Sequence, residues 1–273
     1  MTAIVARDCR LVTANVAKDS SFCRTTTCIP PADSWGDQMP KVKANSITMN
    51  YDQQGTGEPL ILIPYLSADH ACYAFQVAEY AKHFTCISLD LRGTGETDNP
   101  AGAYSTELLA DDVVAFMRAL GIAKAHVSGL SLGAAIGMWL ASKNPNTVKS
   151  LSLHSGWPKK YATKPDYIQS LAAFVRSRPA QSVESFMQQS NAVIAHDAES
   201  QLSRITAPTL ITFGRYDRAT STRFADRMKG RICNSELMIF EGCAHAPIYE
   251  KVEEFNDRTL QFLNTTQGDA ISV

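Results

Sequence analysis

The sequence predicts an α/β fold in which helices flank a mostly parallel central sheet. From about residue 41 onward, short β-like runs alternate with helical stretches, which is the pattern of a sheet covered on both faces. Several runs, such as 59–63, are apolar almost throughout, as strands buried on both faces should be. At 273 residues, of which 45% are hydrophobic, the chain is long enough for one large domain with a sizeable core.

The pattern also divides the chain into segments. Residues 1–38 show no lasting helical or strand period and end in a cluster of proline, serine and glycine, so we expect a poorly ordered N-terminal extension. The core is expected at 39–156 and 206–265. Between these parts, residues 157–205 change to polar helical stretches without a clear strand and predict an inserted helical cap. A C-terminal tail is expected at 266–273.

Individual elements follow from local patterns. The expected strands are 46–51, 60–64, 85–90, 125–129, 149–154, 208–214 and 236–240. Apolar side chains at helical spacing predict a helix with Ser105 as its N-cap and Gly121 just beyond its end. Further helices are expected at 132–143 and 252–263 in the core, and at 167–176 and 183–195 in the cap.

Composition and charge exclude several classes of function. The 26 Lys+Arg and 27 Asp+Glu give a formal charge of −1, which excludes a broad basic surface for nucleic acid. The sequence contains no run of about 18 apolar residues that would predict a membrane span. The seven cysteines form no CxxC pair, so reduced thiols and no metal site are expected. No secretory apolar segment is found, which favours the cytoplasm. A transit peptide is the alternative, because residues 20–27 are rich in hydroxyl groups.

A strand-turn-helix junction carries the first candidate for chemistry. The strand expected at 125–129 leads into Gly129-Leu130-Ser131-Leu132-Gly133, and a helix follows at once. This pattern is typical of a sharp, strained turn that lifts a serine above a sheet, with glycines where a Cβ would not fit. Ser131 is therefore the candidate nucleophile. The N–H of Leu132, at the positive start of the helix, is a candidate oxyanion donor.

A serine nucleophile needs a base, and the base needs a carboxylate that orients it. His245 and Asp217 each follow a predicted strand, so they are expected at the edge where parallel strands end and such sheets build their sites. We expect His245 to be the base and Asp217 the acid. Glu241 and Asp69 are alternative acids.

The remaining histidines have other expected places. His126 and His154 fall in predicted strands and are expected to pack in the core, whereas His83 and His196 are expected at the surface. His70 lies close to a loop that follows a strand and is a candidate for lining a substrate pocket.

Taken together, these motifs resemble those of the α/β-hydrolase fold family over about residues 41–265. The elbow, the acid in Gly-Arg-Tyr-Asp at 214–217 and the base in Gly-Cys-Ala-His at 242–245 match the family in type, order and spacing. Asp-Leu-Arg-Gly-Thr-Gly at 90–95 is similar to a turn that the family carries after a strand. The nearest relatives by resemblance are small serine esterases and lactonases, in particular enol-lactone hydrolases. The resemblance implies the α/β-hydrolase fold with a short helical cap, and no organic cofactor or metal.

The resemblance also implies where the second oxyanion donor lies. Family members generally have a glycine after the strand that ends near residue 63, and an N–H just beyond it is the donor. This chain has Pro64-Tyr65-Leu66 there, so the resemblance assigns the donor to Leu66. Tyr65, His70 and Trp157 are candidates for the pocket wall. The cap is short for this family, which implies an open pocket.

The sequence thus favours a serine hydrolase that cleaves a carboxylic ester or lactone through an acyl-enzyme on Ser131. The alternatives are a carbon–carbon bond hydrolase or cofactor-free perhydrolase on the same triad, or a non-catalytic ligand-binding protein of this fold. The expected partner is a small-molecule ester or lactone. A homodimer is possible. Neither nucleic acid nor a membrane is an expected partner.

Overall fold

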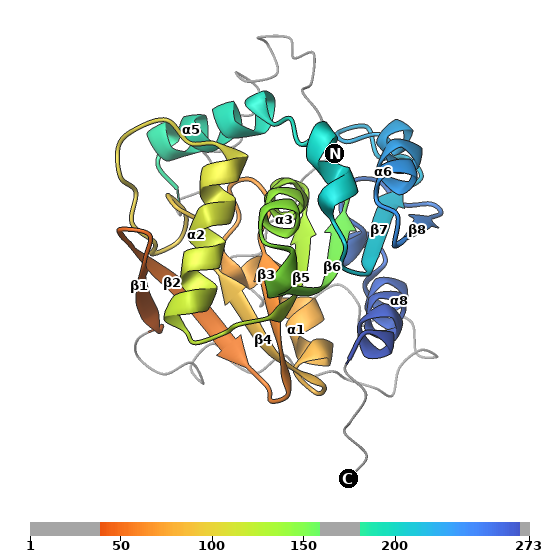
Figure 1. Ribbon diagram of the computed structural model, residues 1–273, viewed down its shortest axis with the longest axis horizontal. Coiled ribbons are helices and arrows are strands. Elements are labelled where there is room, and N and C mark those ends of the chain that lie inside the picture. The colour runs from red at the N-terminus through yellow and green to blue at the C-terminus, as the bar shows by residue number, and fades with distance from the viewer. Residues whose placement is uncertain (1–38, 159–180, 268–273) are drawn as a thin grey trace, which may run out of the picture. The chain divides into compact units, whose positions relative to one another are not determined.

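The computed structural model describes residues 39–158 and 181–267 (Figure 1). The expected N-terminal extension at 1–38, the helix expected at 167–176 and most of the expected tail lie outside these ranges. None of the helices in the described ranges is both long enough and apolar enough to cross a membrane.

A mixed, mostly parallel sheet forms the centre of the described chain. Its strands are β1 (Lys41–Ala44), β2 (Ile47–Gln54), β3 (Glu58–Ile63), β4 (Phe84–Leu89), β5 (Ala125–Leu130), β6 (Val148–His154), β7 (Thr209–Gly214) and β8 (Ser235–Phe240). They lie side by side in the order β1-β2-β4-β3-β5-β6-β7-β8. The pairs β1–β2 and β2–β4 are antiparallel, and every pair from β4 to β8 is parallel. The predicted fold class is therefore confirmed.

Alternating side chains of the strands supply two separate cores. In β3, Ile61 and Ile63 belong to one buried cluster and Leu60 and Leu62 to the other, as expected for a strand with a period of two. The first cluster includes side chains of α2 (Thr106–Ala119), α3 (Leu132–Lys143) and α6 (Ala225–Arg231). The second includes side chains of α1 (Ala74–Tyr80), α7 (Pro247–Glu250) and α8 (Val252–Thr265). Figure 1 shows α2 and α3 in front of the sheet.

The helices begin and end close to the predicted residues. The Ser105 side chain accepts a hydrogen bond from Leu108 N and caps α2, and Gly121 follows the helix with a φ of 72°, a conformation that suits glycine. α3 spans the predicted range, and in the cap α5 (Val183–Ala195) does so too.

Four of the labelled elements have no clear signal in the sequence: β1, α1, α6 and α7. β1 and α7 have four residues each, and α1 and α6 have seven each. Helices this short depend on tertiary contacts rather than on their own periodicity. In α1, for example, the buried Gln76 donates a hydrogen bond to Ile248 O at 3.0 Å, which joins α1 to α7.

His196 corrects one prediction, because it lies in the interior and not at the surface. Its side chain is buried, its Nδ1 lies 2.8 Å from Thr106 Oγ1 at the start of α2, and its ring packs edge-on against Trp157. The predicted core histidines His126 and His154 are buried. The sequence around His196 is polar and gives no signal of burial, which results from the contacts with Thr106 and Trp157.

Two buried histidines should make the fold sensitive to acid. Burial lowers the pKa of His154 to about 3 and that of His196 to about 4, whereas both titrate near 6.5 in an unfolded chain. As the pH falls from 6.5 towards 4, the unfolded chain therefore binds more protons than the folded protein, and stability falls. We expect each histidine to lower the free energy of unfolding by about 1 kcal/mol per pH unit in this window.

Urea denaturation at several pH values measures this slope. His196→Gln should make it shallower, and the same substitution at the exposed His83 should leave it unchanged. Equal slopes in the native protein and in His196→Gln would contradict the prediction.

Candidate active site

Ser131 stands between β5 and α3 in a strained backbone conformation. Its φ of 53° and ψ of −110° lie in a region that residues other than glycine rarely adopt. The Ser131 N–H donates to His154 O of the neighbouring β6 at 2.9 Å, and Ser131 O accepts from Ala135 N at 3.1 Å. These bonds hold the turn between the sheet and the helix, as the Gly-x-Ser-x-Gly pattern predicts.

The two flanking glycines are required by close backbone contacts. A Cβ on Gly129 would lie 2.3 Å from Gly133 C and O. A Cβ on Gly133 would lie 2.2 Å from Ile63 O and 3.0 Å from Pro64 O. The second contact brings the loop after β3 directly against the start of α3.

Gly133→Ala should therefore strongly reduce activity and lower stability, because either α3 or the loop after β3 must move. Gly137→Ala is the matched control on the same helix. Its Cβ would meet only the side-chain ends of Leu151 and Leu153, at 3.2 and 3.3 Å, and alanine favours a helix by about 1 kcal/mol. Thermal unfolding and ester turnover of both variants test this expectation. Equal behaviour of the two would show that the contact at Gly133 is unimportant.

Asp217 and His245 form a hydrogen-bonded pair. His245 Nδ1 lies 2.9 Å from Asp217 Oδ2. Asp217 follows β7 and its side chain is fully buried, whereas one third of the His245 side chain is exposed. When the carboxylate accepts the Nδ1 proton, Nε2 keeps its lone pair and can accept a proton from a nucleophile.

The surroundings of Asp217 keep its carboxylate charged. Its Oδ1 accepts from Ala219 N and Thr220 N at 2.9 and 2.8 Å, and its Oδ2 accepts from Thr220 Oγ1 at 2.6 Å. Burial opposes ionisation, but the hydrogen bonds and the charge of His245, together with those from Thr220, lower the pKa of Asp217 to about 2. Sequence reasoning missed Thr220. The Asp-x-x-Thr spacing, typical of local side-chain-to-backbone turns, is the signal that could have found it.

A ladder of backbone hydrogen bonds runs along the edge that carries these residues. The hydrogen bond from Ser131 N to His154 O joins the ends of β5 and β6. Ser155 N, after β6, donates to Thr212 O of β7 at 2.7 Å, and Tyr216 N, after β7, donates to Cys243 O, after β8, at 2.9 Å. The segments after β5, β6, β7 and β8 are thus tied together in order. This places the serine and the acid–base pair on one edge of the sheet.

In the structure, Asp217 contacts His245, but Ser131 is not hydrogen-bonded to His245. Within 39–158 and 181–267, no hydrogen bond joins the Ser131 hydroxyl to the His245 ring. Catalytic bonds of this kind are often long in the free enzyme and shorten when substrate binds.

The two alternative acids are engaged elsewhere. The exposed Glu241 pairs with Arg215, with Nε to Oε1 at 2.9 Å. Asp69 accepts from Ala71 N and caps the short helix that follows. Among the three candidates, Asp217 is the one that contacts His245.

Leu132 and Leu66 lie where two oxyanion donors would be needed. Leu132 is the first residue of α3, so its N–H is one of those that the helix leaves without an internal partner. Leu66 follows the segment 63–64 that touches Gly133. Both N–H groups therefore belong to segments that meet beside Ser131.

The glycine that this chain lacks near residue 65 is not required here. Ala68 N donates to Tyr65 O at 3.1 Å, which closes a four-residue turn, and the positive φ falls on Ser67, at 62°. Leu66 has no positive φ, so the turn is of type II. Tyr65 occupies its first position, which any residue can adopt.

The three residues expected at a pocket wall have different surroundings. The Tyr65 hydroxyl lies 3.3 Å from the Tyr249 hydroxyl. The His70 ring lies 2.8 Å from the buried Asp90 carboxylate. Burial opposes protonation of His70, but this contact raises its pKa. Trp157 is buried in the core against His196.

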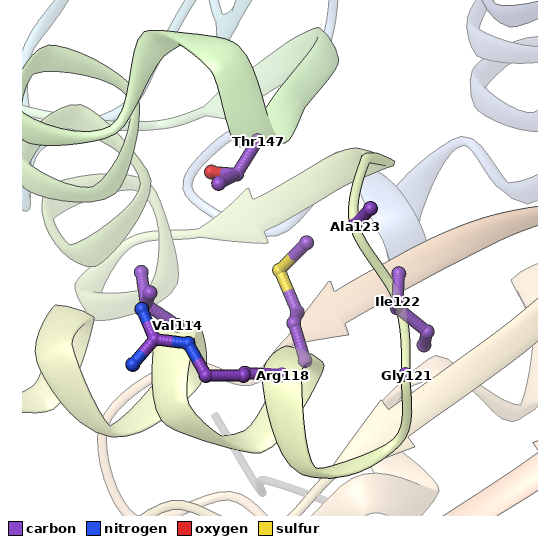
Figure 2. A pocket seen from close by; sticks show the side chains of 7 residues that line it. Val114, Arg118, Gly121, Ile122, Ala123 and Thr147 are labelled. Atoms are coloured by element: carbon purple, nitrogen blue, oxygen red, sulfur yellow. The ribbon is translucent and has the colours of Figure 1, made fainter.

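A surface pocket of about 270 Å³ lies at the opposite edge of the sheet (Figure 2). It is lined by Val114, Met117, Arg118, Gly121, Ile122, Ala123 and Thr147. Ile122 and Ala123 precede β5 and Thr147 precedes β6, whereas Ser131 follows β5. This pocket is therefore separate from the candidate site. Within the described ranges, no group of three histidine, cysteine or acidic residues is placed to hold a metal ion.

Comparisons with known proteins agree with this geometry. A family model described as the alpha/beta hydrolase fold matches residues 58–189. The AB hydrolase superfamily protein YisY of Bacillus subtilis is 27% identical over 80% of this chain and 96% of its own length. The 3-oxoadipate enol-lactonase 2 of Acinetobacter baylyi is 26% identical over 78% of this chain and 92% of its own.

Among solved structures, Est816, described as an N-acyl homoserine lactone degrading enzyme, has a TM-score of 0.75. It is 26% identical and covers 82% of this chain and all of its own. The fold, the elbow at Ser131, the Asp217–His245 pair and these matches lead to one conclusion: the chain has the α/β-hydrolase fold.

Proposed function

We propose that this hydrolase cleaves a carboxylic ester or a lactone through an acyl-enzyme on Ser131. The observation that carries the proposal is the contact of the buried Asp217 carboxylate with His245, on the sheet edge where the strained turn presents Ser131.

The proposed reaction has two halves. In the first half, His245 Nε2 takes the Ser131 proton as Ser131 Oγ attacks the carbonyl carbon. The Leu132 and Leu66 N–H groups stabilise the negative charge that develops on the carbonyl oxygen. The bond to the leaving oxygen then breaks and His245 protonates that oxygen; the alcohol departs from an ester and stays attached to the acyl chain of an opened lactone. In the second half, His245 takes a proton from a water molecule that attacks the acyl carbon, and it returns a proton to Ser131 Oγ as the bond between Oγ and the acyl carbon breaks and the acid is released.

Two observations support the proposal. The charged Asp217 can stabilise the imidazolium that forms when His245 accepts the serine proton, which an acyl transfer of this kind requires. The choice of an ester or lactone as the substrate rests on a curated relative and a solved relative, each 26% identical, that carry lactone-cleaving activities in their names. A carbon–carbon bond hydrolase or perhydrolase would use the same three residues, and pocket shape decides between them.

Turnover of a p-nitrophenyl acetate-type ester, followed by a series of acyl lengths and lactone ring sizes, tests the proposal. A fluorophosphonate probe should attach to Ser131 in the native protein. A folded protein that hydrolyses none of these substrates and does not react with the probe would support a non-catalytic binding role. Preferential cleavage of vinylogous diketones would support the carbon–carbon alternative.

A further inference from the structure

The cap helix α5 lies against the loop that carries the candidate oxyanion donor Leu66. Phe186 is buried, and the Leu66 side chain packs against it. One helical turn further along the same face, the buried Gln189 reaches the next residue of the loop, because its Oε1 accepts from Ser67 N at 3.4 Å. α5 thus contacts two consecutive residues of the loop, one through a side chain and one through the backbone.

The Gln189 side chain is fixed from its other end as well. Its Nε2 donates to Arg92 O at 2.9 Å, in the turn that follows β4. Its Oε1 also accepts from Gln181 Nε2 at 3.0 Å. Because the amide nitrogen of Gln189 donates to the carbonyl of Arg92, its amide oxygen is turned towards the loop that carries Ser67. Ser185 of the same helix donates to Gly93 O, which is a second attachment of α5 to the β4 turn.

The bond to Ser67 matters because the turn at 65–68 is strained. Ser67 has a φ of 62°, a conformation that costs a residue with a Cβ about 1 kcal/mol or more. In a type II turn, the peptide between the second and third residues is rotated relative to the common type I turn. The N–H of Ser67 belongs to this peptide, so an acceptor placed opposite it favours the rotated form.

We propose that Gln189 is a positioning residue that holds the 65–68 turn in its observed form, and so keeps Leu66, at the second position of this turn, where its N–H can serve as an oxyanion donor. The inference rests on the proposed function, in which Leu66 N–H is a donor. It makes the cap helix part of the catalytic arrangement as well as a cover over the core. Phe186 supports the same loop by packing against the Leu66 side chain.

Gln189→Met tests the proposal, because methionine has a similar length and cannot form the hydrogen bonds to Ser67 N, Gln181 Nε2 and Arg92 O. We expect kcat for a p-nitrophenyl ester to fall by about 10- to 100-fold with KM close to the native value, since a misplaced oxyanion donor weakens the transition state more than the bound substrate. Gln188→Met is the matched control. Gln188 is the neighbouring residue, and its Nε2 donates to a carbonyl elsewhere, Gly102 O at 2.8 Å. This variant should keep its kcat.

A second substitution separates positioning from a structural role. Glycine adopts a positive φ without the cost of a Cβ, so Ser67→Gly should favour the type II turn without help from Gln189. We therefore expect Ser67→Gly to restore most of the kcat lost in Gln189→Met. A role limited to attaching α5 to the core would not be rescued in this way. If Gln189→Met does not fold, Gln189→Asn keeps a buried amide that is one methylene too short to reach both loops, and the same loss and rescue are expected.

The outcomes are distinct. Native kcat in the Gln189 variant, or a loss that Ser67→Gly does not restore, would overturn the positioning role while leaving the serine mechanism intact. Full activity in Ser131→Ala would instead overturn the proposed function, and the role of Gln189 with it.

Discussion

Ser131→Ala should lower the kcat of ester hydrolysis by about 10⁵-fold and leave the fold unchanged. The substitution removes the only atom of residue 131 that can form the acyl-enzyme. It keeps the backbone N–H that donates to His154 O and the carbonyl that accepts from Ala135 N. The strained turn should therefore persist, and the loss should be confined to the chemical step.

Steady-state kinetics, fluorophosphonate labelling and thermal unfolding measure the three parts of this expectation. Ser142→Ala is the matched control on the same helix, because the Ser142 hydroxyl donates only to the local carbonyl of Trp139, at 3.1 Å. Ser142→Ala should react and label like the native protein. Near-native turnover in Ser131→Ala would refute the nucleophile assignment.

Asp217→Asn should lower kcat by about 10⁴-fold, because the asparagine would reverse the hydrogen bond to His245. The backbone N–H groups of Ala219 and Thr220 donate to Oδ1 and require an oxygen there. The new NH₂ group must then take the place of Oδ2, 2.9 Å from His245 Nδ1, and donate to it. The ring would carry its proton on Nε2, where it cannot accept the proton of Ser131.

Glu241→Gln is the control for Asp217→Asn, since Glu241 is a carboxylate directly after β8 that pairs with Arg215 at the surface and does not contact His245. It should retain activity. Equal losses in both variants would mean that charge near the site, and not the orientation of His245, explains the effect. A rise in pH should not restore the asparagine variant, because its defect lies in the position of a proton.

The elbow and the acid–base pair could be predicted because their requirements are local. Only glycine fits two positions before and two positions after Ser131, and each partner follows a strand, so residue type and order along the chain suffice. The turn at 65–68 could not be predicted in the same way. Its strained residue is Ser67 and not a glycine, and the conformation depends on Gln189, which is 122 positions away along the chain.

The same distinction explains the histidines. His126 and His154 lie in apolar strands whose burial is visible in the sequence. His196 lies in a polar stretch, and its burial results from packing against Trp157 and Thr106. Contacts between distant segments decide such positions, and a single sequence carries no periodic signal for them.

The first strand of the sheet limits how copies of this protein can associate. β1 is four residues long and carries Lys41 and Lys43, and Lys41 pairs with Glu96 at 2.8 Å. A short outer strand with charged side chains is a poor template for the backbone of another molecule. Strand-by-strand aggregation is therefore disfavoured at the β1 end of the sheet.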